Sequence, residues 1–169
     1  MGRVLASLLM LALAFPALAD SRETAPYSRA GDWQIMVDRT VGNGCFAMVE
    51  YTRGTVVRVG WSPNAPKFYI VYADSRWPRL EINGTYNVKF DFDDGQSVYR
   101  GKLKGVQMGT GTTALLHDNI STEFMIDFGR RGTLTVFNSD NNDRYARLSL
   151  DSSQQALNEL LRCQKQVGG

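Results

Sequence analysis

The chain has 169 residues, of which 43% are apolar, 11% aromatic and 21% charged, a composition typical of a globular protein rather than a disordered, collagenous or coiled-coil one. Its 19 Lys and Arg residues nearly balance its 17 Asp and Glu residues, for a formal net charge of +2, which argues against a nucleic-acid binder that works through a broad basic face. Two cysteines and one histidine are too few for a structural zinc site, so we expect one soluble domain without a metal or a cofactor.

The first 19 residues have the pattern of a cleavable signal peptide. Arg3 supplies a positive charge, an apolar run covers residues 4–15, and an A-x-A cleavage site at residues 17–19 precedes Asp20. As a helix rising about 1.5 Å per residue, this run would cover about 18 Å, which is short of the roughly 30 Å hydrocarbon core of a membrane. No second apolar run of spanning length follows. The mature chain is therefore predicted to begin at Asp20, to lack a membrane span, and to be periplasmic or secreted.

Residues 20–31 have the pattern of an irregular lead-in, and residues 32–169 that of a single β-rich domain. In the first half of this domain, Trp33, Ile35 and Val37 occupy every second position, the period of a half-buried strand. Turns that contain glycine or proline separate this segment from the next ones. The predicted strands here are residues 33–38, 45–51, 55–61 and 68–73.

The second half continues in the same way and adds helical segments. Tyr86, Val88, Phe90 and Phe92 again occupy alternate positions, and a hairpin turn is predicted at residues 93–95. The predicted strands are residues 86–92, 98–106 and 113–116, one that begins at Leu134, and residues 145–150. Phe124 and Phe128 are four positions apart and precede Gly129, which predicts a short helix over residues 121–128 capped by that glycine.

The end of the chain predicts a C-terminal helix. Asp151, Ser152 and Ser153 supply capping side chains, and an apolar stripe follows at helical spacing, formed by Ala156, Leu157, Leu160, Leu161 and Cys163. About nine short strands followed by a helix predict an antiparallel β-sandwich or barrel with a C-terminal α-helix.

Cys45 and Cys163 are the only cysteines, and in an exported protein such a pair is most simply a disulfide. Cys163 lies 118 positions after Cys45, so the bond would fasten the C-terminal helix to a strand near the start of the domain. The alternative is a catalytic thiol, but Cys45 has no histidine near it in the sequence, and there is no C-x-x-C spacing.

Few residues in the sequence match the motif of a catalytic site. His117 stands next to Asp118, but there is no G-x-S-x-G motif, and neighbours on a strand point to opposite faces. We therefore interpret His117 as a surface or strand-end residue. Neither of the two Asp-rich turns supplies the bidentate Glu of a calcium loop. The sequence thus predicts no catalytic residue and no metal site, although a hydrolase with an unrecognised carboxylate pair stays open because distances across a sheet cannot be inferred from sequence.

One stretch and one turn are candidate binding surfaces. Large aromatic side chains mixed with arginine are typical of recognition surfaces, and the candidates on this basis are Trp61, Tyr69, Arg76 and Trp77, in a stretch that also holds Tyr72. Arg130 and Arg131, just after the short helix, are candidates to meet an acidic partner. The alternatives are that the aromatic residues are core or cross-strand partners and that the two arginines form a solvated turn at the negative end of the helix.

Several segments resemble small exported proteins of alphaproteobacteria: the leader, residues 44–51 beginning Gly44-Cys45-Phe46, and the ending from Leu148-Ser149-Leu150 to Cys163. The layout also resembles the invasion-associated locus B family, secreted β-rich proteins linked to host-cell entry. This resemblance implies a secreted β fold and a role in host interaction.

The function expected from the sequence is that of an exported, non-enzymatic binding protein of the bacterial envelope. Its partner would be a protein or an envelope ligand rather than a nucleic acid. The alternatives are a periplasmic inhibitor or immunity-type protein that blocks a hydrolase, and a hydrolase that uses the unrecognised carboxylate pair.

Overall fold

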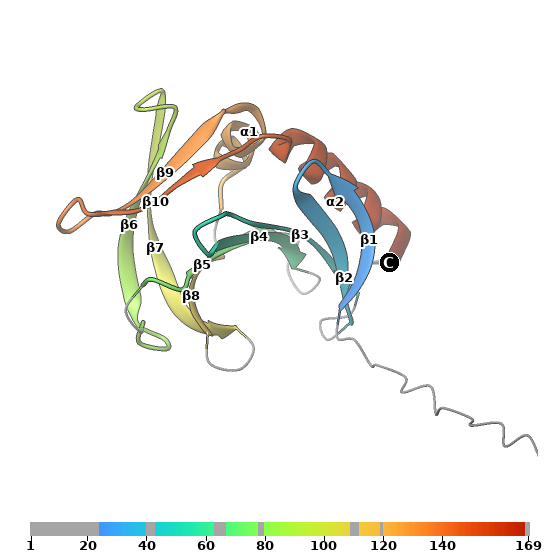
Figure 1. Ribbon diagram of the computed structural model, residues 1–169, viewed down its shortest axis with the longest axis horizontal. Coiled ribbons are helices and arrows are strands. Elements are labelled where there is room, and N and C mark those ends of the chain that lie inside the picture. The colour runs from blue at the N-terminus through green and yellow to red at the C-terminus, as the bar shows by residue number, and fades with distance from the viewer. Residues whose placement is uncertain are drawn as a thin grey trace, which may run out of the picture.

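Ten antiparallel strands and two helices make up the part of the chain that the structure, a computed structural model, describes (Figure 1). The described residues are 24–39, 43–62, 67–77, 80–108, 112–118 and 120–167. The signal peptide predicted for residues 1–19 lies outside these ranges. Within them, neither helix combines the length and the apolar character that crossing a membrane requires.

All ten strands belong to one sheet. They are β1 (Thr24–Ala30), β2 (Trp33–Asp38), β3 (Gly44–Glu50), β4 (Thr55–Ser62), β5 (Lys67–Asp74), β6 (Thr85–Phe92), β7 (Ser97–Met108), β8 (Thr112–His117), β9 (Thr133–Asn138) and β10 (Arg144–Ser149). Their order in the sheet is β1-β2-β3-β4-β5-β8-β7-β6-β9-β10. The predicted mainly antiparallel β class is confirmed. The sheet does not close into a barrel, because β1 and β10 are its two edges.

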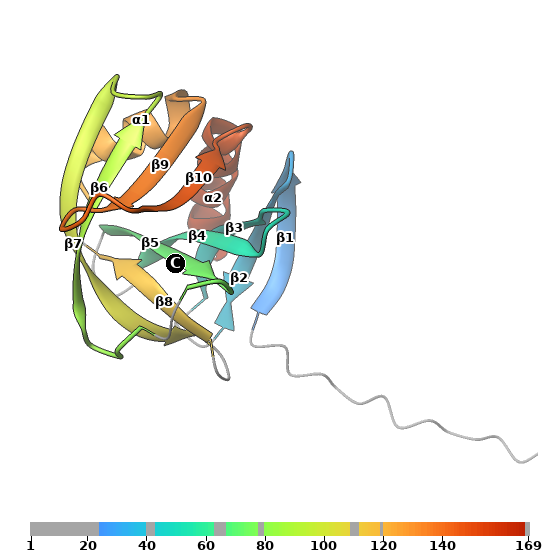
Figure 2. The same cartoon turned by 60° about the vertical axis from the view of Figure 1, so that its left-hand side comes forward.

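The sheet is strongly curved, and the two helices lie against its inner side. In Figures 1 and 2, β6, β7, β9 and β10 form one side of the curve, and β1 to β5 with β8 form the other. Helix α1 (Thr122–Arg130) lies between the two sides, and α2 (Ser153–Val167) packs on β1, β2, β3 and α1. The predicted C-terminal helix is therefore present and covers the N-terminal end of the sheet.

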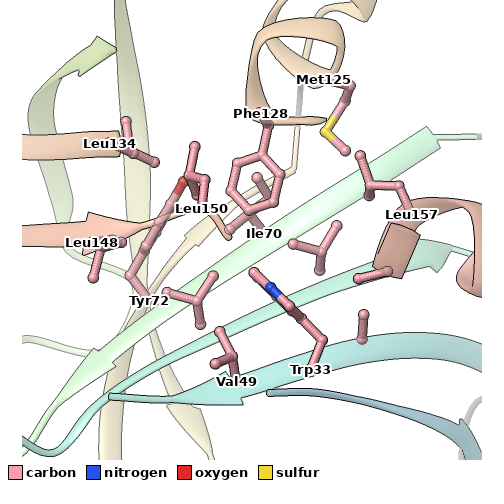
Figure 3. Close-up of a cluster of buried hydrophobic side chains, with 14 of the residues drawn as sticks. Trp33, Val49, Ile70, Tyr72, Met125, Phe128, Leu134, Leu148, Leu150 and Leu157 are labelled. Atoms are coloured by element: carbon pink, nitrogen blue, oxygen red, sulfur yellow. The ribbon is translucent and has the colours of Figure 1, made fainter. Parts of the chain in front are cut away.

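The apolar core fills the space between the inner face of the sheet and the helices. Figure 3 shows inward-facing side chains from both sides of the curve meeting Phe128 of α1 and Leu157 of α2. The rings of Trp33 and Phe128 meet edge to face with their centroids 5.9 Å apart, and both are almost fully buried. Burying one large apolar side chain stabilises the fold by about 1.5–3 kcal/mol. Because both sides of the curve contribute side chains to the same core, the core joins them.

The segment expected to be an irregular lead-in contains a strand, so that expectation is wrong for residues 24–30. They form β1, which pairs antiparallel with β2 through a register shift between Pro26 and Ser28. An edge strand tolerates a proline because one row of its backbone groups has no partner strand. From β1, the Tyr27 hydroxyl donates to Gln166 Oε1 at 2.5 Å and the Ser28 hydroxyl donates to Glu159 Oε2 at 3.0 Å. Partners on β2 and α2 therefore hold this strand in place.

Helix α1 ends later than predicted, and Gly129 does not cap it. The helix begins after Ser121, whose hydroxyl accepts from the Phe124 N–H at 3.2 Å, and its C-cap is Arg131. Gly129 is buried where α1 meets α2, and a Cβ at this position would lie 3.3 Å from Leu157. The glycine therefore lets the two helices approach each other closely.

The predicted disulfide between Cys45 and Cys163 is confirmed. It joins β3 to α2, with the two Cα atoms 6.0 Å apart, and both cysteines are buried. The Cys45 N–H also donates to Gln164 Oε1 at 2.9 Å. The predicted apolar stripe of α2 is buried at Ala156, Leu157, Leu160 and Cys163, whereas Leu161 is 40% exposed and lies outside it.

Candidate functional site

A cavity of about 420 Å³ opens beside the edge strand β10. Its walls are the turn between β3 and β4, the residues that follow β5, and β10 itself. The lining residues are Tyr51, Thr52, Arg53, Thr55, Arg76, Arg144, Tyr145, Ala146 and Arg147. Four of these residues are arginines and none is acidic, so we call this space the arginine cavity.

A tight turn places Arg53 on the rim of this cavity. The Gly54 N–H donates to the Tyr51 carbonyl at 2.9 Å, and the Tyr51 N–H donates to the Thr55 carbonyl at 2.8 Å. Gly54 has a φ of +79°, a conformation that glycine adopts without the steric cost of a Cβ. Thr52 and Arg53 at the tip of the turn are both exposed. The register of the sheet pairs Thr55 with Asp74, which brings the end of β5 to the same place.

Arg76 is held in a fixed orientation by Asp74. Its Nε donates to Asp74 Oδ1 at 2.8 Å, and its Nη2 donates to Asp74 Oδ2 at 2.5 Å. The Thr55 hydroxyl donates to the same carboxylate. The side chain of Asp74 has no exposed surface, whereas that of Arg76 is 51% exposed. The hydrogen bond from Arg76 is the main reason that the pKa of Asp74 falls from 3.8 to about 2.

The other three arginines differ in whether they have an ionic partner. Arg147 makes two hydrogen bonds to Asp94, at 2.5 and 2.9 Å. Arg53 and Arg144 are exposed, and among the described residues neither guanidinium forms an ion pair. The arginine cavity therefore holds two guanidinium groups that are available to a ligand, beside one that is fixed in place by Asp74.

Aromatic packing supports the cavity at Tyr145. The register between β9 and β10 shifts between Arg144 and Ala146, so Tyr145 lies in a bulge. Its ring packs against Trp77, with the centroids 5.4 Å apart, and partial burial raises the pKa of its hydroxyl. A bulge redirects a side chain from the regular pleat, and here it accompanies a contact between β10 and the segment that carries Arg76.

A smaller cavity of about 170 Å³ adjoins the first one. It is lined by Asp32, Trp33, Val49, Glu50, Tyr51, Thr52, Ser149 and Asp151. Three of these residues are acidic and none is basic, so we call it the acidic cavity. It shares Tyr51 and Thr52 with the arginine cavity.

Tyr51 forms the wall between the two cavities. Its hydroxyl donates to the Ser149 carbonyl at 2.5 Å, which joins the β3–β4 turn to the edge strand β10. Burial raises the pKa of Tyr51, and the negative charges of Asp151 and Asp32 raise it further. The hydroxyl therefore remains a protonated donor at neutral pH.

The aromatic residues singled out in the sequence lie at two ends of the β4–β5 pair. Trp61 is opposite Phe68 at one end, with the rings edge to face at 4.8 Å. Tyr69 lies at the same end, and its hydroxyl accepts from Arg58 Nε at 2.9 Å. Arg76 and Trp77 follow the other end, and of these four candidates only Arg76 lines the arginine cavity. Tyr72 is in the core.

Arg130 is the last residue of α1 and Arg131 is its C-cap, and neither lines the two cavities. Arg131 donates from Nε to Asp127 Oδ1 at 3.2 Å and from Nη2 to Ser97 Oγ at 3.1 Å. Arg130, in the last turn of α1, is exposed. Arg131 is therefore tied to α1 and β7, and only Arg130 presents its charge to solvent without such ties.

Sequence reasoning missed Arg53, Arg144 and Arg147. Each is a single charge in an ordinary turn or strand, and Arg53 is far from the other two along the chain. The one local signal is the pair of arginines at positions 144 and 147 of a strand that is otherwise half-buried. Only the fold brings them to one cavity.

His117 lies at the end of β8, as the sequence indicates, but it is buried rather than on the surface. Its ring stacks on Phe90 at 5.3 Å and meets Phe124 edge to face. Its Nδ1 atom has no hydrogen-bond partner in the described part of the chain, and burial lowers its pKa. Asp118 lies outside this aromatic cluster and pairs with Lys104 at 3.8 Å. The histidine therefore acts as a neutral core ring in this fold.

The described ranges contain no group of three His, Cys, Asp or Glu side chains placed to hold a metal ion. In comparisons with known proteins, no protein-family model, no curated protein and no solved structure matches this chain. The two adjoining cavities and their charges are therefore the basis for an argument about function.

Proposed function

We propose that this chain is an exported, non-enzymatic binding protein of the bacterial envelope that holds an anionic group of its ligand in the arginine cavity. The observation that carries the proposal is the lining of that cavity, which has four arginines and no acidic residue. A guanidinium group presents a planar fork of donors that matches a carboxylate or a phosphate. The ligand is a protein or another envelope component that displays such a group.

Arg53 and Arg144 are the residues expected to bind the anion. They are exposed and form no ion pair among the described residues. Arg76 adds a third guanidinium group, whose charge is balanced by Asp74 and whose position that carboxylate sets before binding. A hydrogen bond to a charged group contributes about 1.5–3 kcal/mol, so losing one guanidinium should weaken binding by about tenfold or more.

The disulfide supports the exported part of the proposal. Structural disulfides persist in oxidising compartments such as the periplasm and the cell exterior, and Cys45 and Cys163 form one here. If the leader is cleaved as its pattern indicates, protein purified from a bacterial periplasm should have the intact mass of a chain that begins at Asp20, and it should contain no free thiol. Protein that keeps residues 1–19 or stays in the cytoplasm would contradict this part.

The anion site can be tested on periplasmic protein with pyrophosphate and citrate as probes, by calorimetry at low and at physiological salt. Arg53→Gln combined with Arg144→Gln should abolish or greatly weaken binding. Arg130→Gln is the matched control, because it removes an exposed arginine outside both cavities. Equal binding by the double variant and the wild type would refute the proposal. Unchanged thermal unfolding would show that the variants remain folded.

The acidic cavity favours the hydrolase as a second candidate, because three carboxylates line it. All three residues, Asp32, Glu50 and Asp151, are exposed, whereas the general acid of a glycosidase is kept protonated by an apolar environment. Under the binding proposal, no turnover of chromogenic glycosides or peptidoglycan is expected. Turnover that is lost in Glu50→Gln or Asp151→Asn, with folding retained, would favour the hydrolase instead.

A further inference from the structure

We propose that the two cavities together bind one extended peptide segment of a partner protein, with acidic side chains in the arginine cavity and a basic side chain in the acidic cavity. This inference rests on the proposed function and identifies its ligand. The cavities carry opposite charges and adjoin each other at Tyr51 and Thr52. A partner that fits both must carry both signs of charge on one stretch.

The cavities follow one another along the edge strand β10. Residues 144–147 line the arginine cavity, and Ser149 and Asp151 line the acidic one. Strand β10 has a single neighbour, β9, in the sheet order, so its other edge has no partner strand among the described residues. An edge of this kind is where an extended peptide adds by main-chain hydrogen bonds.

The backbone of β10 has groups that point to this open edge. The Ser149 carbonyl accepts from Tyr51, and the N–H of the same peptide group, at Leu150, donates in the opposite direction to the Gly132 carbonyl just before β9, so this carbonyl faces the cavities. Backbone groups on a strand alternate between the two edges, and the N–H and carbonyl of Arg147 therefore face the same way. The Ser149 carbonyl has two lone pairs and can accept a peptide N–H without losing Tyr51. The Tyr51 ring can stay as the wall over which the peptide passes.

The spacing of the cavities sets the spacing of charges on the peptide. From Ala146 to Leu150, at the centres of the two lined stretches, is four residues, or about 13 Å at 3.3 Å per residue. In an extended peptide, side chains four positions apart lie on the same face and span the same length. A free amino acid, which extends only about 3.5 Å per residue, cannot reach both cavities. The acidic and basic positions should therefore be four residues apart.

The test uses acetylated and amidated octapeptides of glycine and serine that carry two adjacent glutamates and, four positions on, two adjacent lysines. Both orders of the charges are made, since the strand can add in either direction. We call these two peptides, in which the glutamates and the lysines are kept apart, the segregated peptides. One control is a peptide of the same composition in which glutamate and lysine alternate. The other is each segregated peptide with its central peptide bonds N-methylated. Binding to periplasmic protein is measured by calorimetry at low and physiological salt.

One of the two segregated peptides should bind at least about tenfold tighter than the alternating one, and N-methylation should cost a similar factor. Arg53→Gln with Arg144→Gln should weaken the same peptide by about tenfold or more. Glu50→Gln with Asp151→Asn should weaken it only while its lysines are present, and not when they are replaced by serine. Glu123→Gln is the control for the acidic pair, because Glu123 is exposed on α1 and outside both cavities.

No binding of either segregated peptide, equal binding of the alternating peptide, or insensitivity to N-methylation would each overturn the inference. If pyrophosphate or citrate still binds through Arg53 and Arg144 in that case, the proposed function stands with a different ligand. If no probe depends on these two arginines, both proposals fail.

Discussion

Removing the Cys45–Cys163 bond should lower the free energy of unfolding by a large fraction of its total. The bond closes a loop of 118 residues. The loop-entropy relation gives about 4.9 kcal/mol at 25 °C for a loop of this length, as an upper value that measured proteins often do not reach. Natural domains are stable by about 5–15 kcal/mol. We therefore expect a loss of about 3–5 kcal/mol, with the fold still formed at 25 °C.

The structure indicates that this loss arises in the unfolded chain rather than in the native one. Helix α2 keeps its other anchors when the bond is removed. Ala156 and Leu160 are buried in the core, the Cys45 N–H donates to Gln164, and Ser28 donates to Glu159. The helical signal in circular dichroism should therefore be unchanged before the unfolding transition begins.

The assay is urea unfolding followed by tryptophan fluorescence and by far-ultraviolet circular dichroism. Oxidised protein, protein equilibrated with a reductant throughout, and the variant Cys45→Ala with Cys163→Ala are compared. The reduced protein keeps both sulfur atoms and measures the crosslink alone, whereas the alanine variant also loses buried atoms. The slope of the transition should rise without the bond, because the unfolded chain exposes more surface.

Two results would refute this reasoning. A loss below about 1 kcal/mol in the reduced protein would mean that the crosslink does not restrict the unfolded chain as the loop relation requires. Loss of the helical signal ahead of the fluorescence change would mean that α2 depends on the bond for its place in the native fold.

Three further predictions concern buried groups. Burial lowers the pKa of His117 below its ordinary 6.5. The stability gained by burying the neutral ring is therefore complete above pH 6.5 and declines as the pH falls below that value. In unfolding measured from pH 7 to pH 5, His117→Phe should flatten this dependence. Hydrogen bonds from Arg76 lower the pKa of Asp74 from 3.8 to about 2, so stability should fall between pH 4 and pH 2, and Asp74→Asn should remove this part of the acid dependence. A Cβ on Gly60 would lie 2.2 Å from the Tyr69 ring, so Gly60→Ala should cost about 1–3 kcal/mol in urea unfolding. The added cost should be smaller in a chain that also carries Tyr69→Ala, and equal costs in both backgrounds would contradict the contact.

The sequence by itself determines most of the strands, the C-terminal helix and the disulfide. The alternation of Trp33 and Ile35, or of Phe90 and Phe92, shows which side chains face the core, because a pleated strand has a period of two. These side chains are among the most deeply buried. The pairing of Cys45 with Cys163 follows because a chain that is expected to be exported and has two cysteines offers one partner for each. These features depend on local pattern or on composition.

The edge strand β1 depends on the tertiary structure. Its sequence has no apolar alternation and contains Pro26, so it has little preference of its own for a strand. Pairing with β2 and side-chain contacts with α2, near the other end of the chain, supply what its sequence lacks. Contacts of this range have no local signature, because the groups that stabilise the strand are provided by distant segments.

The arginine cavity is likewise decided by the fold alone. Arg53 and Arg144 are single charges, one in a turn and one on an edge strand. They meet because the chain passes from β5 to β6 and from β8 to β9 across strands that lie between them in the sheet, which places β10 beside the β3–β4 turn. Hydrophobic periodicity encodes which face of each strand is buried. It does not encode the order and register of strands, which depend on the packing of the whole core and determine which surface residues become neighbours.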